Sequence, residues 1–166
     1  MTTDKTGLKF MKHASFLLSA LAGLLVSSAV IAKAPAKVEF LNSGKVLPTT
    51  LPFSEAVRVG DMLYLSGQIG IEPGTLKLVP GGIKEETKQA MSNIKTTLEA
   101  HGYKLGDLVK CTVMLADIAK WGEFNEIYKT YFAGRYPARS ALGVNGLAIG
   151  AQVELDCIAV AGASQH

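Results

Sequence analysis

The chain has few of the side chains on which most hydrolytic and metal-dependent enzymes rely. Its 166 residues include only three histidines and two cysteines, and His13, His101 and His166 stand far apart in the sequence. It has no Cys-x-x-Cys pair and no glycine-rich loop that ends in Lys-Ser or Lys-Thr. These absences argue against a Ser-His or Cys-His nucleophile and a His-ligated metal. We therefore predict chemistry by arginine, carboxylate, hydroxyl and backbone groups, with no cofactor and no metal.

Residues 1–32 have the order of a secretory signal peptide. Lys9 and Lys12 precede the uncharged apolar run FLLSALAGLLV, residues 16–26, and small residues follow it. This run has the ~7–15 residues typical of a signal and is shorter than the ~20 that span a bilayer. We expect cleavage after Ala32 and a periplasmic or secreted protein, which meets a membrane only if the segment is kept.

The remaining chain has little net charge. Losing residues 1–32 removes three of the 17 basic residues and one of the 14 acidic residues, so the net charge falls from +3 to +1. Affinity for phosphate backbones comes mainly from clustered cations, and no Lys/Arg stripe is present. We therefore expect no nucleic-acid partner.

The order of strand and helix patterns predicts one α+β domain. We expect residues 33–51 to lead into a domain at 52–162, followed by a tail at 163–166. Apolar spacing predicts helices over 83–102 and 121–132 and strands over 53–60, 62–70, 76–79, 108–117, 138–144 and 152–161. The result is a single mixed sheet of about six strands with both helices packed on one face. The bare face then favours a homo-oligomer.

Cys111 and Cys157 both lie in strand-like apolar runs. An oxidising compartment would permit a disulfide between them. A small core residue is the commoner explanation for a cysteine in such a run, and we favour it here.

Arg139 leads into the strand predicted from PARSALGV. Its guanidinium must find an anion, and two interpretations are open. One is a ligand carboxylate or phosphate held by the planar fork of N–H donors. The other is an internal ion pair with Glu154 or Asp156, or a stem that lies along the surface. Arg135, by contrast, is expected to be solvated at the end of the second helix.

Glu154 and Asp156 are two residues apart in the last predicted strand, so both point to the same face of the sheet. Two carboxylates in such a position belong either to a solvated face or to a lined cleft. The nearby Arg139 gives some support to the cleft.

Several segments together resemble the RidA/YjgF family of reactive-intermediate deaminases. They are LYLSGQIG, GGIKEETKQAMSNIKTTLEAHGY, GDLVKCTVMLAD, FNEIYKTYF, YPARSALGV and VELDCIAVAG, in order from Pro52 to Gly162. The resemblance implies a chorismate-mutase-like fold, assembled as a homotrimer whose sheets form a barrel, with sites in clefts between subunits. It also implies the hydrolysis of 2-imino acids, such as 2-iminobutanoate or 2-iminopropanoate, to 2-keto acids and ammonia.

The resemblance assigns roles to individual residues. Arg139 would bind the carboxylate of a small substrate, and Glu154 would position the attacking water. Ser66 and Gly67 would line the pocket. Asn125 could also reach the cleft from the second helix, whereas Tyr128 at its helical spacing is expected in the core.

Two positions depart from the family's pattern. Phe53 stands where the deaminases often have tyrosine, and Ala141 stands where they often have cysteine. The pocket thus loses a hydroxyl contact and a thiol, which predicts an altered choice of substrate. Other functions stay open: a non-catalytic small-carboxylate-binding protein, a chaperone-like member, or an endoribonuclease, the last disfavoured by the low charge.

Overall fold

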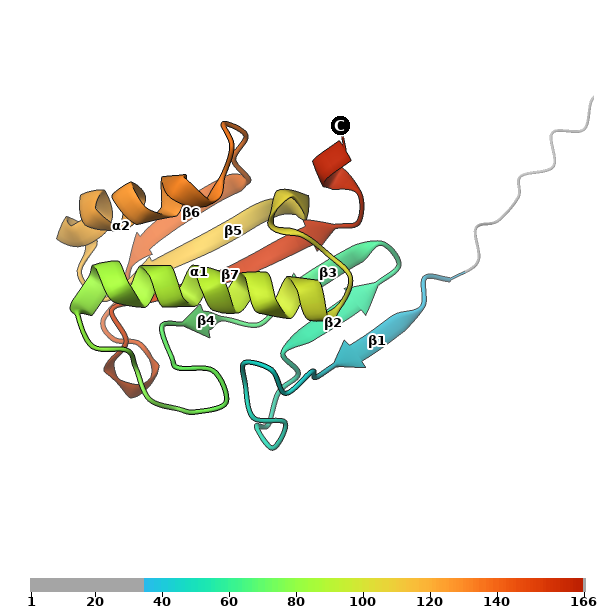
Figure 1. The fold of residues 1–166 in the computed structure, drawn as a ribbon, viewed down its shortest axis with the longest axis horizontal. Coiled ribbons are helices and arrows are strands. Elements are labelled where there is room, and N and C mark those ends of the chain that lie inside the picture. Colours follow the sequence, from blue (N-terminus) through green and yellow to red (C-terminus); the bar gives the residue numbers. More distant parts are fainter. Residues whose placement is uncertain (1–34, 166) are drawn as a thin grey trace, which may run out of the picture. The chain divides into compact units, whose positions relative to one another are not determined.

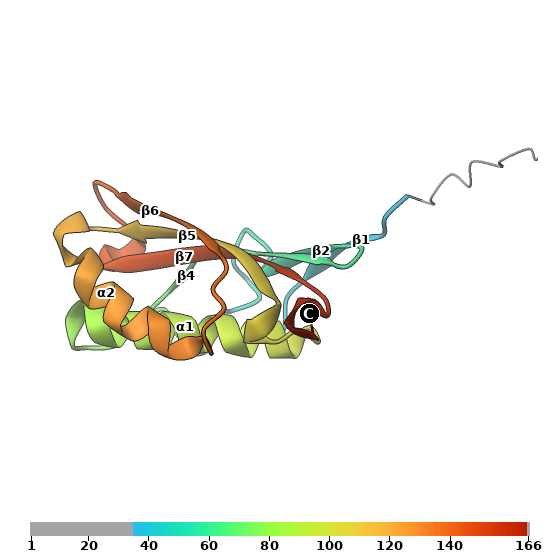
Figure 2. The same ribbon diagram turned by 90° about the horizontal axis from the view of Figure 1, so that it is seen from above.

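The structure is a computed structural model that describes residues 35–165 as two layers, a mixed β-sheet and two helices on one of its faces (Figure 1, Figure 2). The predicted signal peptide at residues 1–32 lies outside the described residues. Within them, no helix is long and apolar enough to span a bilayer. The α+β class and the two helices on one face are confirmed.

The sheet has seven strands, and one helix follows the fourth strand and the other follows the fifth strand in the chain. The strands are β1 (Val38–Leu41), β2 (Ala56–Val59), β3 (Met62–Leu65), β4 (Gln68–Ile69), β5 (Leu108–Leu115), β6 (Ala138–Gly143) and β7 (Val153–Val160). The helices are α1 (Gly82–Ala100) and α2 (Trp121–Tyr128), and α2 continues as one 3₁₀ turn over Lys129–Tyr131.

The strand β7 lies at the centre of the sheet. The order is β1-β2-β3-β7-β5-β6, and the short β4 also pairs with β7. Only β5 and β6 pair in parallel, because α2 carries the chain back between them. The predicted hairpin between β2 and β3 is confirmed, and Gly60 supplies the left-handed turn at φ 59°.

Three details of the sheet differ from the prediction. The strand β1 was not predicted, although it pairs with β2 in antiparallel register. Residues 62–70 form two strands, because the chain leaves the ladder at Ser66 and Gly67 before β4 begins. Residues 76–79 form no strand, and only an isolated bridge joins Ile71 to Leu78.

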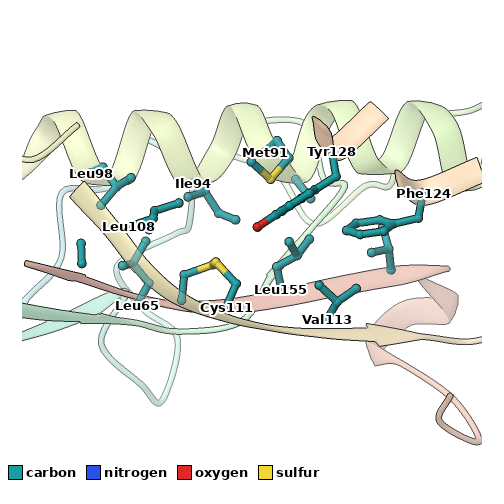
Figure 3. Close-up of a cluster of buried hydrophobic side chains, with 14 of the residues drawn as sticks. Leu65, Met91, Ile94, Leu98, Leu108, Cys111, Val113, Phe124, Tyr128 and Leu155 are labelled. Carbon is teal, nitrogen blue, oxygen red and sulfur yellow. A yellow bond between two sulfur atoms is a disulfide. The ribbon is translucent and has the colours of Figure 1, made fainter. Parts of the chain in front are cut away.

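The core lies between α1, α2 and the sheet (Figure 3). The predicted inner face of α1 is confirmed, since Ile83, Thr87, Ala90, Met91, Ile94 and Leu98 are all buried. The helix ends in a Schellman motif, in which the Tyr103 N–H donates to Leu98 O at 2.9 Å and Gly102 has φ 85°. Each large side chain buried in this way contributes roughly 1.5–3 kcal/mol.

A disulfide joins Cys111 on β5 to Cys157 on β7. Our preference for two unlinked core cysteines was therefore wrong. The two residues are direct partners in the antiparallel register, with their Cα atoms 4.1 Å apart, which is a relation that the sequence could not show. Both side chains face the helices, and Figure 3 places Cys111 in the core.

The other face of the sheet carries exposed apolar side chains. Val38 and Phe40 on β1, Tyr64 on β3 and Leu142 on β6 are each between 40% and 73% exposed. Their neighbours in register, such as Val57 and Val59, point the same way. A face of this composition is suited to contact with another protein surface.

The disulfide should contribute substantially to the free energy of unfolding, because it closes a loop of 46 residues in the unfolded chain. We expect the paired Cys111→Ala/Cys157→Ala variant to lose about 2–4 kcal/mol in urea denaturation. Wild-type protein treated with reductant under denaturing conditions should unfold at the same urea concentration as this variant. An unchanged midpoint in both would show that the cross-link adds no stability.

Candidate functional site

Arg139 lies on the helix side of β6, in register with Cys111 of β5. Three aromatic rings of α2 surround its guanidinium. The guanidinium carbon lies 4.8 Å from the ring centroid of Tyr128, 5.5 Å from that of Phe124 and 5.9 Å from that of Trp121. These cation–π contacts orient the charge without neutralising it.

No acidic side chain of residues 35–165 pairs with Arg139, and no hydrogen bond within this part of the chain uses its N–H groups. The alternative of an internal ion pair with Glu154 or Asp156 was therefore wrong. Both carboxylates point to the face of the sheet opposite to Arg139, because they alternate with the buried Leu155 and Cys157. A half-buried guanidinium with unpaired donors is suited to an external anion.

The guanidinium opens into a cavity of about 420 Å³, which we call the arginine pocket. Its lining consists of Trp121, Asn125, Tyr128, Lys129, Tyr136, Pro137 and Arg139. Tyr128 is buried in the core, as predicted, and burial raises the pKa of its hydroxyl to about 12 although the Arg139 charge lowers it. This hydroxyl stays protonated at neutral pH, and it has no hydrogen-bond partner among the described residues.

Glu154 lies in a second cavity of about 400 Å³, which we call the carboxylate pocket. Phe53, Ser66 and Gly67 line the same pocket, and the remaining lining is apolar. Burial raises the pKa of the Glu154 carboxyl, and the nearby charge of Asp156 raises it further. A carboxylate in such surroundings is a stronger base than one in water.

The break between β3 and β4 places Ser66 and Gly67 beside Glu154. The Ser66 hydroxyl donates to the carbonyl of Ser54 at 2.7 Å, so its oxygen is oriented and can still accept a hydrogen bond. Gly67 has no room for a side chain, because a Cβ there would overlap Glu154 Oε1. The glycine thus allows the carboxylate to lie directly against the backbone.

The predicted site residues fall into two groups on opposite faces of the sheet. Arg139 and Asn125 line the arginine pocket, whereas Glu154, Ser66, Gly67 and Phe53 line the carboxylate pocket. Ala141 lines neither, because its side chain packs against the core next to Val113.

A third cavity, of about 550 Å³, contains none of the predicted site residues. Arg135 lies on its wall and donates to the carbonyl of Ala163 at 2.9 Å. Arg135 is therefore exposed as expected, but it also ties the C-terminal turn to the segment before β6. Among the described residues, no cluster of His, Cys, Asp and Glu could hold a metal ion.

Reasoning from the sequence missed the three aromatic rings around Arg139 and the apolar lining of the carboxylate pocket. The spacing of Trp121, Phe124 and Tyr128 identified one face of α2, but the arginine that meets this face comes from a strand after the helix. Ile149 and Leu76 reach the carboxylate pocket from separate loops, for which no periodic pattern exists.

The family model described as "Endoribonuclease L-PSP" matches residues 44–161. A 2-iminobutanoate/2-iminopropanoate deaminase of Mus musculus is 48% identical over 124 residues, which are 71% of this chain and 92% of that protein. RidA of the Antarctic bacterium Psychrobacter has a crystal structure with a TM-score of 0.69 and 35% identity, covering 74% of this chain and 98% of that one. The crystal structure of E. coli TdcF with bound serine has a TM-score of 0.68 and 29% identity, and it also covers 74% of this chain and 98% of that one.

These similarities, together with the two-layer fold and the unpaired arginine, define the class of protein. The chain belongs to the Endoribonuclease L-PSP family, and the solved structures similar to it include RidA and YjgF proteins. The matched region begins after β1 and ends one residue after β7, so it includes both pockets.

Gly67→Ala should displace the Glu154 carboxylate while leaving the fold intact, because the atom that must move is the far end of a flexible side chain. A misplacement of about 1 Å can cost roughly 100-fold in rate, so we expect kcat/KM for an imino acid to fall by ~10–100-fold. The free energy of unfolding, measured by urea denaturation, should change by less than about 1 kcal/mol. Unchanged kinetics would mean that the position of this carboxylate does not matter.

Proposed function

We propose that this protein hydrolyses 2-imino acids to 2-keto acids and ammonia, at sites that form between neighbouring subunits of a homotrimer. The observation that carries the proposal is Arg139, a half-buried guanidinium without an acidic partner among residues 35–165. The deaminase names of relatives such as those of Mus musculus and Homo sapiens, 48% and 45% identical, support it.

Arg139 binds the carboxylate of the substrate. Its planar fork can donate two parallel N–H bonds, which fixes both the position and the orientation of a small carboxylate. Asn125, on the same pocket wall, can add a side-chain hydrogen bond. The serine bound to TdcF supports this choice of ligand, since serine carries the same α-carboxylate.

Glu154 activates water for attack on the imine carbon. The water oxygen bonds to C2 while the Glu154 carboxylate accepts a proton from the water. The C=N π electrons move to nitrogen in the same step. Glu154 then gives this proton to the amine nitrogen. The C–N bond breaks, the C2 oxygen forms the C=O bond as its proton passes back to Glu154, and ammonia and the keto acid leave. A protonated imine is already a good electrophile, so orientation and electrostatics supply the catalysis. The raised pKa of Glu154 suits this role.

The proposal takes the two pockets of each site from different subunits. Arg139 and Glu154 point to opposite faces of one sheet. A molecule as small as a 2-imino acid therefore cannot contact both side chains of a single chain. A head-to-tail ring places the arginine pocket of one subunit against the carboxylate pocket of the next. The exposed apolar face, with Phe40 and Tyr64, then becomes buried inside the ring.

Export is the second part of the proposal. Residues 1–32 act as the signal, cleavage follows Ala32, and residues 33–51 lead into the catalytic domain at 52–162 with a short tail at 163–166. The disulfide between Cys111 and Cys157 supports a periplasmic or secreted location, because disulfides persist in oxidising compartments. Amino-terminal sequencing of protein from the periplasmic fraction should begin at Lys33, and recovery from the cytoplasm alone would contradict export.

The Arg139→Lys variant tests the function. It keeps the charge but loses the fork, so kcat/KM should fall at least about 100-fold, close to 3 kcal/mol of transition-state binding. The assay couples an amino-acid oxidase to the purified protein and follows the disappearance of the imine. Lys129→Arg, on the wall of the same pocket, is the matched control for a change of cation.

The outcomes of this assay separate the candidate functions. Near-wild-type hydrolysis by Arg139→Lys would rule out the assignment of the arginine. Saturable binding of 2-keto acids without faster decay of any imine would instead indicate a non-catalytic carboxylate-binding protein.

Mixing two inactive variants tests the arrangement between subunits. Trimers refolded from equal amounts of Arg139→Lys and Glu154→Gln chains should regain about one quarter of the wild-type sites, because an intact site needs one unmodified residue from each neighbour. Trimers refolded only from chains that carry both substitutions should regain no active sites. Absence of recovery in mixed trimers would show that each site lies within a single subunit.

A further inference from the structure

The carboxylate pocket is far more apolar than a site for the smallest imino acids requires. Besides Glu154, Ser66 and Gly67, its walls include Leu51, Phe53, Leu76 and Ile149. Phe53, Leu76 and Ile149 are 48%, 53% and 56% exposed, and they come from three separate loops. Exposed large apolar side chains that converge on one cavity mark a site for an apolar group.

The backbone of Ile149 has an unfavourable conformation, so placing its side chain at this pocket costs conformational energy. Its φ of 51° and ψ of 21° lie in the left-handed region, and no other non-glycine residue of 35–165 has a positive φ. A β-branched residue is a poor choice for this conformation, and Asn or Gly would fit without strain. Strain of this kind clusters at functional sites. Here it holds an apolar side chain at the rim of the pocket that contains Glu154.

The size of the pocket also exceeds that of the smallest substrates. The alanine-derived 2-imino acid has six non-hydrogen atoms, which fill at most about 180 Å³ even if the whole molecule, carboxylate included, lay in this pocket and each atom took the ~30 Å³ share of a water molecule. The pocket holds about 400 Å³. The leucine-derived and phenylalanine-derived imino acids have nine and twelve such atoms and match this space better.

We propose that this protein acts preferentially on 2-imino acids with branched or aromatic apolar side chains, and that these side chains bind in the carboxylate pocket against Phe53, Leu76 and Ile149. The inference rests on the proposed function. With the substrate carboxylate at Arg139 of the neighbouring subunit and C2 beside Glu154, the side chain on C2 must lie along the walls that surround Glu154. Phe53, whose ring lacks a hydroxyl, keeps that wall apolar.

The test compares imino acids made in the assay by an amino-acid oxidase from alanine, leucine and phenylalanine. For the wild-type protein, kcat/KM for the leucine- and phenylalanine-derived imino acids should exceed that for the alanine-derived one by at least about tenfold. Ile149→Asn, which suits the left-handed backbone but is polar, should lower this ratio about tenfold, and so should Leu76→Gln. Ile118→Asn is the matched control, since Ile118 is 50% exposed and lines none of the three cavities.

A binding measurement keeps the inference separate from the catalytic proposal. Calorimetry with pyruvate, 4-methyl-2-oxopentanoate and phenylpyruvate should show the same preference for the larger 2-keto acids, and Ile149→Asn should reduce it. If no imine decays faster but this binding preference holds, the proposed function fails and the preference for apolar ligands stands. Equal affinities for the three acids, or equal effects of Ile149→Asn and Ile118→Asn, would overturn the inference. It would also be overturned if Ile149→Asn weakened trimer assembly without changing the ratio.

Discussion

The candidate site depends on one positive charge that the described part of the chain does not neutralise. The Arg139 guanidinium is held against Tyr128, Phe124 and Trp121 rather than against a carboxylate. Each such contact is worth roughly 0.5–2 kcal/mol, enough to orient the group but not to occupy its hydrogen-bond donors. The fold thus keeps a directed cation available to an anionic ligand.

The sheet separates this cation from Glu154, the carboxylate that the proposed chemistry also needs. Alternation along β6 and β7 directs Arg139 toward the helices and Glu154 toward the apolar face. The same apolar face favours association with other copies of the chain. Assembly and catalysis therefore have a common physical origin in this proposal, because one surface drives the contact and the contact completes the site.

The disulfide links the stability of the fold to the geometry of the arginine pocket. The chain between Cys111 and Cys157 includes α2 and β6, which carry the three aromatic rings and Arg139. Joining the ends of this loop at the centre of the sheet limits how far these elements can separate in partly unfolded states.

The sequence by itself determined most of the helices and strands and the types of side chain available for chemistry. Periodic spacing predicted α1, α2 and the strands β2, β5, β6 and β7, because burial of one face imposes a period of 3.6 or 2 on apolar residues. Only the tertiary structure decided which residues meet. Register paired Cys111 with Cys157, and the break after β3 brought Gly67 to Glu154. Loops without any period placed Ile149 at the same pocket, since contacts between distant segments leave no local pattern to read.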